Sequence, residues 1–69
     1  MSTSGLGNRM KTLRAEAGLT QADLATQVGV TRKTINTVEN GVFVPSALLA
    51  LKIARALDRS VEDVFFLES

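Results

Sequence analysis

Residues 20–41 constrain the fold more than any other part of the chain, because they predict two short helices joined by a tight turn. Thr20 and Thr31 are residue types favoured as helix N-caps, and apolar residues follow each of them at helical spacing. Gly29 supplies the positive φ that such a turn needs, and Val30 can pack beneath both helices. The stretch therefore predicts a helix-turn-helix motif at about residues 20–40.

A further helix is expected before this motif, and a loop after it. Apolar residues recur at steps of four, three and four from Leu6 to Ala17, and Gly18 suits a left-handed C-terminal cap. This pattern predicts a first helix over residues 7–17. Residues 42–45, Val-Phe-Val-Pro, are expected to form an extended loop, because the residue before a proline is kept out of the helical region.

Two more helices are expected beyond the loop. Ser46 is the N-cap of an expected helix that runs to residue 57. Ser60 opens a short final turn with three apolar residues expected to face the core: Val61, Val64 and Phe65. The prediction is an all-α fold, a compact five-helix bundle in a single domain over residues 1–69, without a second, ligand-sensing domain.

The chain contains no cysteine and no histidine. This composition excludes disulfides, thiolate nucleophiles, imidazole bases and the usual zinc and haem ligands. We therefore expect no enzyme activity, no metal and no cofactor. The longest unbroken apolar run, residues 47–51, has five residues, whereas a membrane span needs about 20. No membrane association is expected, and a cytoplasmic location is the default.

The charged residues are distributed unevenly. The formal net charge of +1 gives no indication of a nucleic-acid partner by itself. Residues 1–37, however, carry five basic groups against two acidic ones, whereas residues 38–69 carry three against five. The half with a net charge of +3 contains the predicted helix-turn-helix.

The second helix of the motif has an outward face of hydrogen-bonding side chains. At about 100° per residue, Ile35 and Val38 share one side of this helix. The opposite side and its flanks carry Arg32, Lys33, Thr34, Asn36, Thr37 and Asn40. Arginine and lysine favour guanine in the major groove and asparagine favours adenine, so this face suits duplex DNA. The alternative is that the cations are ordinary solvated side chains and that Thr31, Thr34 and Asn40 only cap or terminate the helix.

The motif resembles the helix-turn-helix domains of the Cro and phage-repressor type, the XRE family of bacterial regulators. The matching residues read LRAEAGLTQADLATQVGVTRKTINTVENG, and the match continues through PSALLALKIARAL and SVEDVF. The resemblance implies a lambda-repressor-like fold and a sequence-specific, double-stranded-DNA-binding transcriptional regulator. It also implies a homodimer that represses transcription from a near-palindromic operator, with the helix at about 31–40 in the major groove.

The resemblance assigns roles to individual residues. Arg14 and Glu39 match a structural ion pair that joins the first helix to the end of the recognition helix. Residues that match base-reading positions, or share their exposed face, are Thr31, Arg32, Lys33, Asn36 and Thr37. Residues that match phosphate contacts are Gln21, Thr34 and Asn40.

Two departures from the family pattern concern apolar residues. Val42 stands where the family commonly has a basic residue, and Leu48 stands where a polar one is usual. Together with Val44 and Leu51, these side chains exceed what the predicted core can bury, and we interpret the excess as a dimer surface. The dimer interface itself is expected in residues 60–69, at Val61, Val64, Phe66 and Leu67. The alternative is an antitoxin or co-regulator that binds a partner protein, such as a toxin, through this apolar surface.

Overall fold

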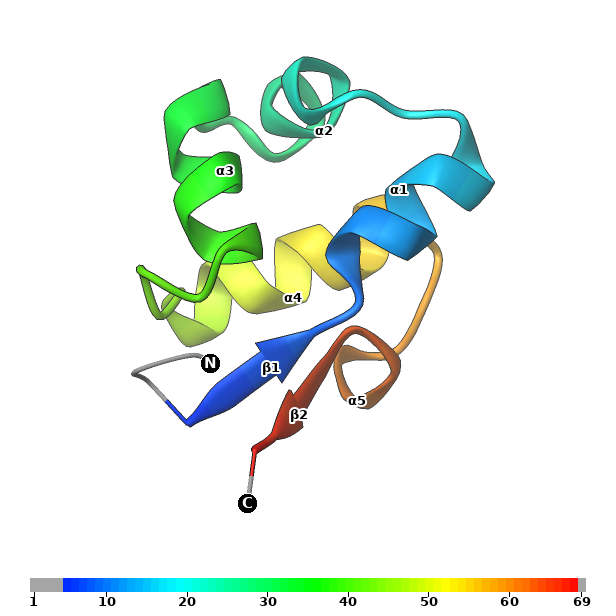
Figure 1. Cartoon of the computed structure of the whole chain (residues 1–69). Coiled ribbons are helices and arrows are strands. Elements are labelled where there is room, and N and C mark those ends of the chain that lie inside the picture. The colour runs from blue at the N-terminus through cyan, green and yellow to red at the C-terminus, as the bar shows by residue number, and fades with distance from the viewer. Residues whose placement is uncertain (1–4, 69) are drawn as a thin grey trace.

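The fold is known from a computed structural model that describes residues 5–68 (Figure 1). In this part of the chain, five helices follow the predicted order, and a two-stranded sheet is added to them. The helices are α1 (Met10–Ala17), α2 (Gln21–Val28), α3 (Arg32–Glu39), α4 (Ala47–Ala56) and α5 (Val61–Val64). The strands are β1 (Leu6–Asn8) and β2 (Phe65–Leu67). The predicted five-helix, lambda-repressor-like architecture is confirmed.

The N-caps explain where four of the helices begin. The side chains of Thr20, Thr31, Ser46 and Ser60 each accept a hydrogen bond from the main-chain N–H three residues later, as predicted. Gly29 ends α2 with a φ of 77°, in the left-handed region that glycine adopts without strain. These local signals set the turn between α2 and α3, which lie side by side in Figure 1.

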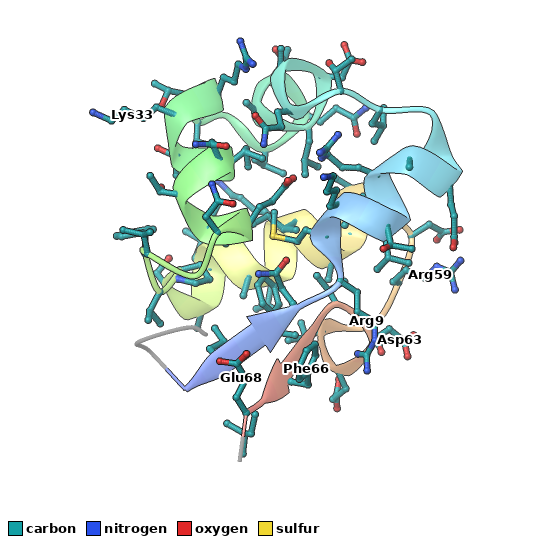
Figure 2. All side chains as sticks on the ribbon, in the orientation of Figure 1. Arg9, Lys33, Arg59, Asp63, Phe66 and Glu68 are labelled. Carbon is teal, nitrogen blue, oxygen red and sulfur yellow. The ribbon has the colours of Figure 1, made fainter. Side chains whose placement is uncertain are left out.

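The first helix is shorter than the sequence predicts. Residues 7–9 were expected to be helical, but Leu6–Asn8 pairs antiparallel with Phe65–Leu67, and α1 begins at Met10. In the pairing, Gly7 lies opposite Phe66, whose ring covers it so closely that a Cβ at Gly7 would overlap the ring. The Arg9 guanidinium lies over the same Phe66 ring, 4.5 Å from the ring centroid (Figure 2). The sheet therefore holds the two ends of the described chain together.

The core lies between the helices and is apolar throughout. Its fully buried side chains, which come from α1 to α5, are Met10, Leu24, Ile35, Val38, Ile53 and Val64. Val64 is 0% exposed. The prediction that it contributes to a dimer surface is therefore wrong, because α5 turns Val64 into the core. Val61, which was also expected at the dimer interface, is half-buried.

Among the described residues, no helix is long and apolar enough to cross a membrane.

Candidate nucleic-acid interface

The outer face of α3 is polar and cationic, and its inner face is apolar. Ile35 and Val38 anchor α3 in the core, so the opposite side of the helix must face solvent. Arg32, Lys33 and Asn36 are exposed there, and Figure 2 shows Lys33 extending away from the body of the protein. Of the expected DNA-contacting residues, the structure brings Gln21, Arg32, Lys33 and Asn36 together around one shallow pocket. Thr31 and Asn40 are the caps of α3, and Thr34 and Thr37 are half-buried on it.

Arg32 and Lys33 have no carboxylate partner in the described part of the chain. The ion pairs found there join Arg14 to Glu39 and Arg59 to Glu16, and neither includes the cations at the start of α3. Together with Gln21 and Asn36, the two cations line a shallow pocket on the outer surface. An exposed cationic surface without neutralising acids attracts phosphate.

The three threonines of α3 and its cap are engaged with the helix backbone. The Thr31 hydroxyl accepts a hydrogen bond from the Thr34 main-chain N–H at 3.2 Å and lies 3.1 Å from the Thr34 hydroxyl. Thr37 donates its hydroxyl hydrogen to the Thr34 carbonyl oxygen at 2.9 Å. The hydroxyl oxygen of Thr37 keeps its capacity to accept a hydrogen bond, but its hydrogen is already donated inside the helix.

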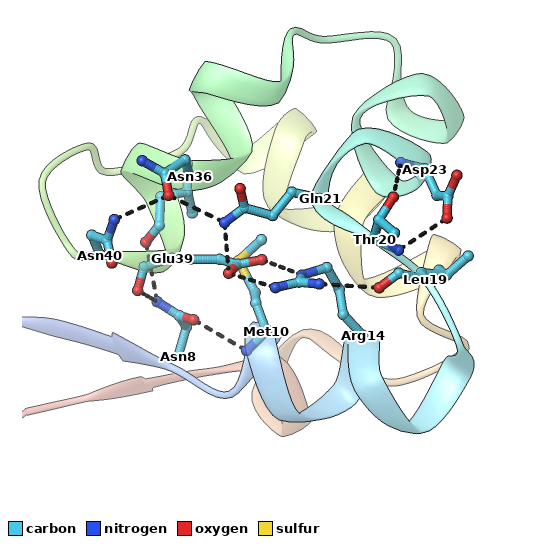
Figure 3. A network of polar contacts seen from close by, with 11 residues as sticks. Asn8, Met10, Arg14, Leu19, Thr20, Gln21, Asp23, Asn36, Glu39 and Asn40 are labelled. Carbon is cyan, nitrogen blue, oxygen red and sulfur yellow. Dashed lines mark hydrogen bonds and ion pairs between the residues drawn. The ribbon is translucent and has the colours of Figure 1, made fainter.

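Arg14 and Glu39 join α1 to the last turn of α3. The Arg14 Nε donates to Glu39 Oε2 at 2.6 Å and Nη2 donates to Oε1 at 3.1 Å, while Nη1 donates to the Leu19 carbonyl oxygen at 3.0 Å (Figure 3). The two side chains are only 13% and 5% exposed. The hydrogen bonds that Arg14 donates to Glu39, reinforced by the negative charge of Glu39, raise the pKa of Arg14 although partial burial opposes this. This pair fixes where α3 sits on the core.

A chain of amide groups runs from this ion pair to the outer face of α3. Gln21 Nε2 donates to Glu39 Oε1 and to Asn36 Oδ1, both at 3.2 Å, and Asn40 Nδ2 donates to Asn36 Oδ1 at 3.3 Å. The sequence analysis placed Gln21, Asn36 and Asn40 separately on the surface and missed this connection. Because both amide hydrogens of Gln21 are donated within the protein, the donor it offers to a phosphate is its main-chain N–H in the first turn of α2.

Asn8 is a further residue that the sequence analysis missed. Its side-chain oxygen accepts a hydrogen bond from the Met10 N–H at 3.1 Å. Its amide nitrogen donates to the main-chain oxygens of Val38 and Glu39, at 3.1 and 3.3 Å. Asn8 thus connects β1, the start of α1 and the end of α3. An asparagine just before a helix is a recognisable capping signal, but partners 30 residues away are not.

The chain is similar to known proteins in sequence and in fold. Residues 10–64 match the family described as Helix-turn-helix. A Bacillus subtilis protein, named the uncharacterized HTH-type transcriptional regulator YgzD, is 52% identical over 61 residues, which span 88% of this chain and 92% of that protein. The P22 c2 repressor, solved with a synthetic operator, aligns with a TM-score of 0.75 and 28% identity over 78% of this chain and 82% of its own. Antitoxin HipB of Escherichia coli O6:H1 is 35% identical over 60 residues, 87% of this chain and 64% of that protein.

Proposed function

The chain belongs to the helix-turn-helix family of DNA-binding transcriptional regulators, of the XRE, Cro and phage-repressor type, and we propose that it reads duplex DNA by placing α3 in the major groove. The observation that carries this proposal is the exposed, unpaired cationic face of α3 beside the start of α2. Arg32 and Lys33 are the side chains with the reach and charge to contact guanine edges. Thr31, Asn36 and Thr37 share their face.

Phosphate contacts are assigned to the rim of this surface. Gln21 lies in the first turn of α2, where free main-chain N–H groups and the helix dipole favour an anion. Thr34 and Asn40 lie on α3 beside the base-reading face. Such contacts fix the register of a protein on the duplex and carry no sequence information.

The protein is proposed to act as a homodimeric repressor in the cytoplasm, at the nucleoid. The support is its similarity to the P22 c2 repressor and the exposed apolar side chains outside the DNA-facing surface. These include Leu67, which is 88% exposed, and Phe66, with Val42, Val44, Leu48 and Leu51 on the loop before α4 and on α4. A two-fold dimer of one domain, residues 1–69, would bind a near-palindrome with half-sites about 34 Å apart, one helical turn of DNA.

Selection of bound duplexes from a random pool tests this function. We expect the wild-type protein to enrich one site that consists of two inverted half-sites. Enrichment of a single half-site would contradict the dimer, and no enrichment at all would contradict sequence-specific binding. Placing the selected site across a reporter promoter then tests repression, for which we expect less transcript when the protein is present.

A second candidate function is that of an antitoxin or co-regulator that binds a partner protein. The specific observation in its favour is the similarity to antitoxin HipB. The apolar side chains of the α3–α4 loop and of α4 would then contact the partner and would remain exposed in a homodimer. Apolar surface that stays exposed on the purified homodimer would favour this candidate, whereas a protein that stays monomeric in size-exclusion chromatography with light scattering would contradict the dimer.

A further inference from the structure

The hydrogen bonds around α3 indicate which atoms Asn36 can offer to a base. We infer that Asn36 reads its base as a hydrogen-bond donor only, so that it selects guanine over adenine. The inference rests on the proposed function, because it assumes that α3 enters the major groove. It reverses the sequence-based expectation that an asparagine on this face favours adenine.

The orientation of the Gln21 amide follows from Glu39. A carboxylate can only accept hydrogen bonds, and Glu39 is held in place by two hydrogen bonds from Arg14. The Gln21 atom that lies 3.2 Å from Glu39 Oε1 must therefore be the amide nitrogen, since a carbonyl oxygen there would be repelled. The ion pair thus determines which way Gln21 points.

The orientation of the Asn36 amide follows from Gln21. The same Gln21 nitrogen carries a second hydrogen and lies 3.2 Å from the side chain of Asn36, so the facing Asn36 atom must be its oxygen. Asn40 donates to this oxygen as well, at 3.3 Å. A carbonyl oxygen has two lone pairs, and here both have a donor. Turning the Asn36 amide over would break both hydrogen bonds and place amide nitrogens against each other.

The amide nitrogen of Asn36 is what remains for a ligand. It has no hydrogen bond to another residue in the described stretch 5–68, and Figure 3 shows it pointing away from the network. Asn36 is exposed and lines the same shallow pocket as Arg32 and Lys33. The two hydrogens of its amide group are therefore presented to solvent beside the two cations.

The base preference follows from this geometry. Recognition of adenine by asparagine uses both ends of the amide, because the oxygen accepts from adenine N6 while the nitrogen donates to N7. In this protein the oxygen is already occupied. Guanine offers two neighbouring acceptors in the major groove, N7 and O6, to the two amide hydrogens, whereas adenine offers only N7, beside an amino group that also donates, and thymine offers only O4. Guanine is therefore the base that best matches an amide that can only donate.

Selections with variants test the inference. The wild type and Asn36→Ala are each used to select from the same random duplex pool, and we expect Asn36→Ala to lose preference at one position of the half-site. In the wild-type site that position should hold guanine, with adenine binding roughly 5- to 150-fold more weakly, the discrimination typical of one specific base contact. An adenine or a thymine at the Asn36-dependent position, or an unchanged site for Asn36→Ala, would overturn the inference and leave the proposed function intact. A wild type that selects no site would overturn both.

The role of Gln21 as a positioning residue is tested by Gln21→Met, which keeps a side chain of similar length and removes the donor. With one lone pair of Asn36 released, we expect adenine to bind better at the Asn36-dependent position relative to guanine. Gln27→Met, on the exposed side of α2, is the matched control and should leave the preference unchanged. Equal preferences in Gln21→Met and the wild type would contradict the positioning role.

A DNA-independent measurement checks the orientation itself. In ¹⁵N spectra of the free protein, the side-chain amide hydrogens of Gln21 should exchange with water more slowly than those of Asn36, because only the former are hydrogen-bonded within the protein. Gln21→Met should shift the side-chain amide signals of Asn36 and Asn40. Slower exchange at Asn36 than at Gln21 would overturn the inference without any reference to DNA.

Discussion

Arg14 and Glu39 form a two-point ion pair, with Nε to Oε2 at 2.6 Å and Nη2 to Oε1 at 3.1 Å, between α1 and the end of α3. Both side chains are largely removed from water. The pair therefore has a structural role, and through Gln21 it also sets the orientation of the amide groups on the DNA-facing surface.

Glu39→Ala is expected to destabilise the protein by about 3–5 kcal/mol, because it leaves the Arg14 charge buried without a partner. The matched control is Glu16→Ala, which removes the exposed Glu16–Arg59 ion pair, 3.3 Å long with side chains 56% and 48% exposed. That change should cost at most about 1 kcal/mol. Thermal unfolding followed by circular dichroism measures both, and a Glu39→Ala melt that matches the wild type would contradict the structural role.

The close contact of Gly7 with Phe66 predicts that Gly7→Ala destabilises the β1–β2 sheet. The new methyl group would overlap the Phe66 ring, and overpacking of this kind costs about 1–3 kcal/mol. Urea unfolding of Gly7→Ala measures the loss. The same substitution in a Phe66→Ala background removes the overlap and should cost much less than in the wild type. Equal costs in the two backgrounds would show that the ring is not what excludes a side chain at Gly7.

The capping box at the start of α2 predicts a specific pH dependence. The main-chain N–H of Thr20 donates to the Asp23 carboxylate at 3.0 Å, and this, with the Thr20 side-chain contact, lowers the pKa of Asp23. A lowered pKa means that the stabilisation is present above the unfolded-state pKa and is lost as the pH falls through the folded-state value. The difference in unfolding free energy between the wild type and Asp23→Asn should therefore be constant near neutral pH and shrink below about pH 4. A difference that grows on acidification would contradict the assignment.

Leu67→Glu is expected to abolish the proposed homodimer, because it places a charge on the most exposed apolar side chain of β2. Size-exclusion chromatography with light scattering measures the mass. Thr12→Glu, an exposed position on α1, adds the same charge elsewhere and should leave the dimer intact. A dimer that survives Leu67→Glu would move the interface away from β2, toward the apolar residues of α4.

The helices could be predicted from the sequence because their determinants are local. Thr20, Thr31, Ser46 and Ser60 bond to main-chain groups only three residues away, so a cap residue and the apolar spacing after it suffice. The outward face of α3 followed from helical periodicity in the same way. The resemblance to known repressors added the Arg14–Glu39 pair, which periodicity alone does not reveal.

The sheet and the amide chain could not be predicted, because their partners are distant in sequence. Each strand has only three residues, too few to show an alternating pattern, and β1 pairs with β2 across almost the whole chain. Val64 illustrates the consequence. It was expected both in the core and at the dimer interface, and the structure confirms the first expectation and contradicts the second, because Val64 is buried while Leu67 of β2 lies outside.

Base reading by the outer face of α3 is tested by the affinity of Arg32→Ala for the selected duplex. Fluorescence anisotropy should show Arg32→Ala weakening binding to that duplex by about 1–3 kcal/mol, with a smaller effect on a scrambled duplex, because base contacts act only at the preferred sequence. Arg55→Ala, which removes the same charge from the exposed side of α4, is the matched control and should bind both duplexes like the wild type. Equal affinities of Arg32→Ala and the wild type for the selected duplex would contradict base reading by α3.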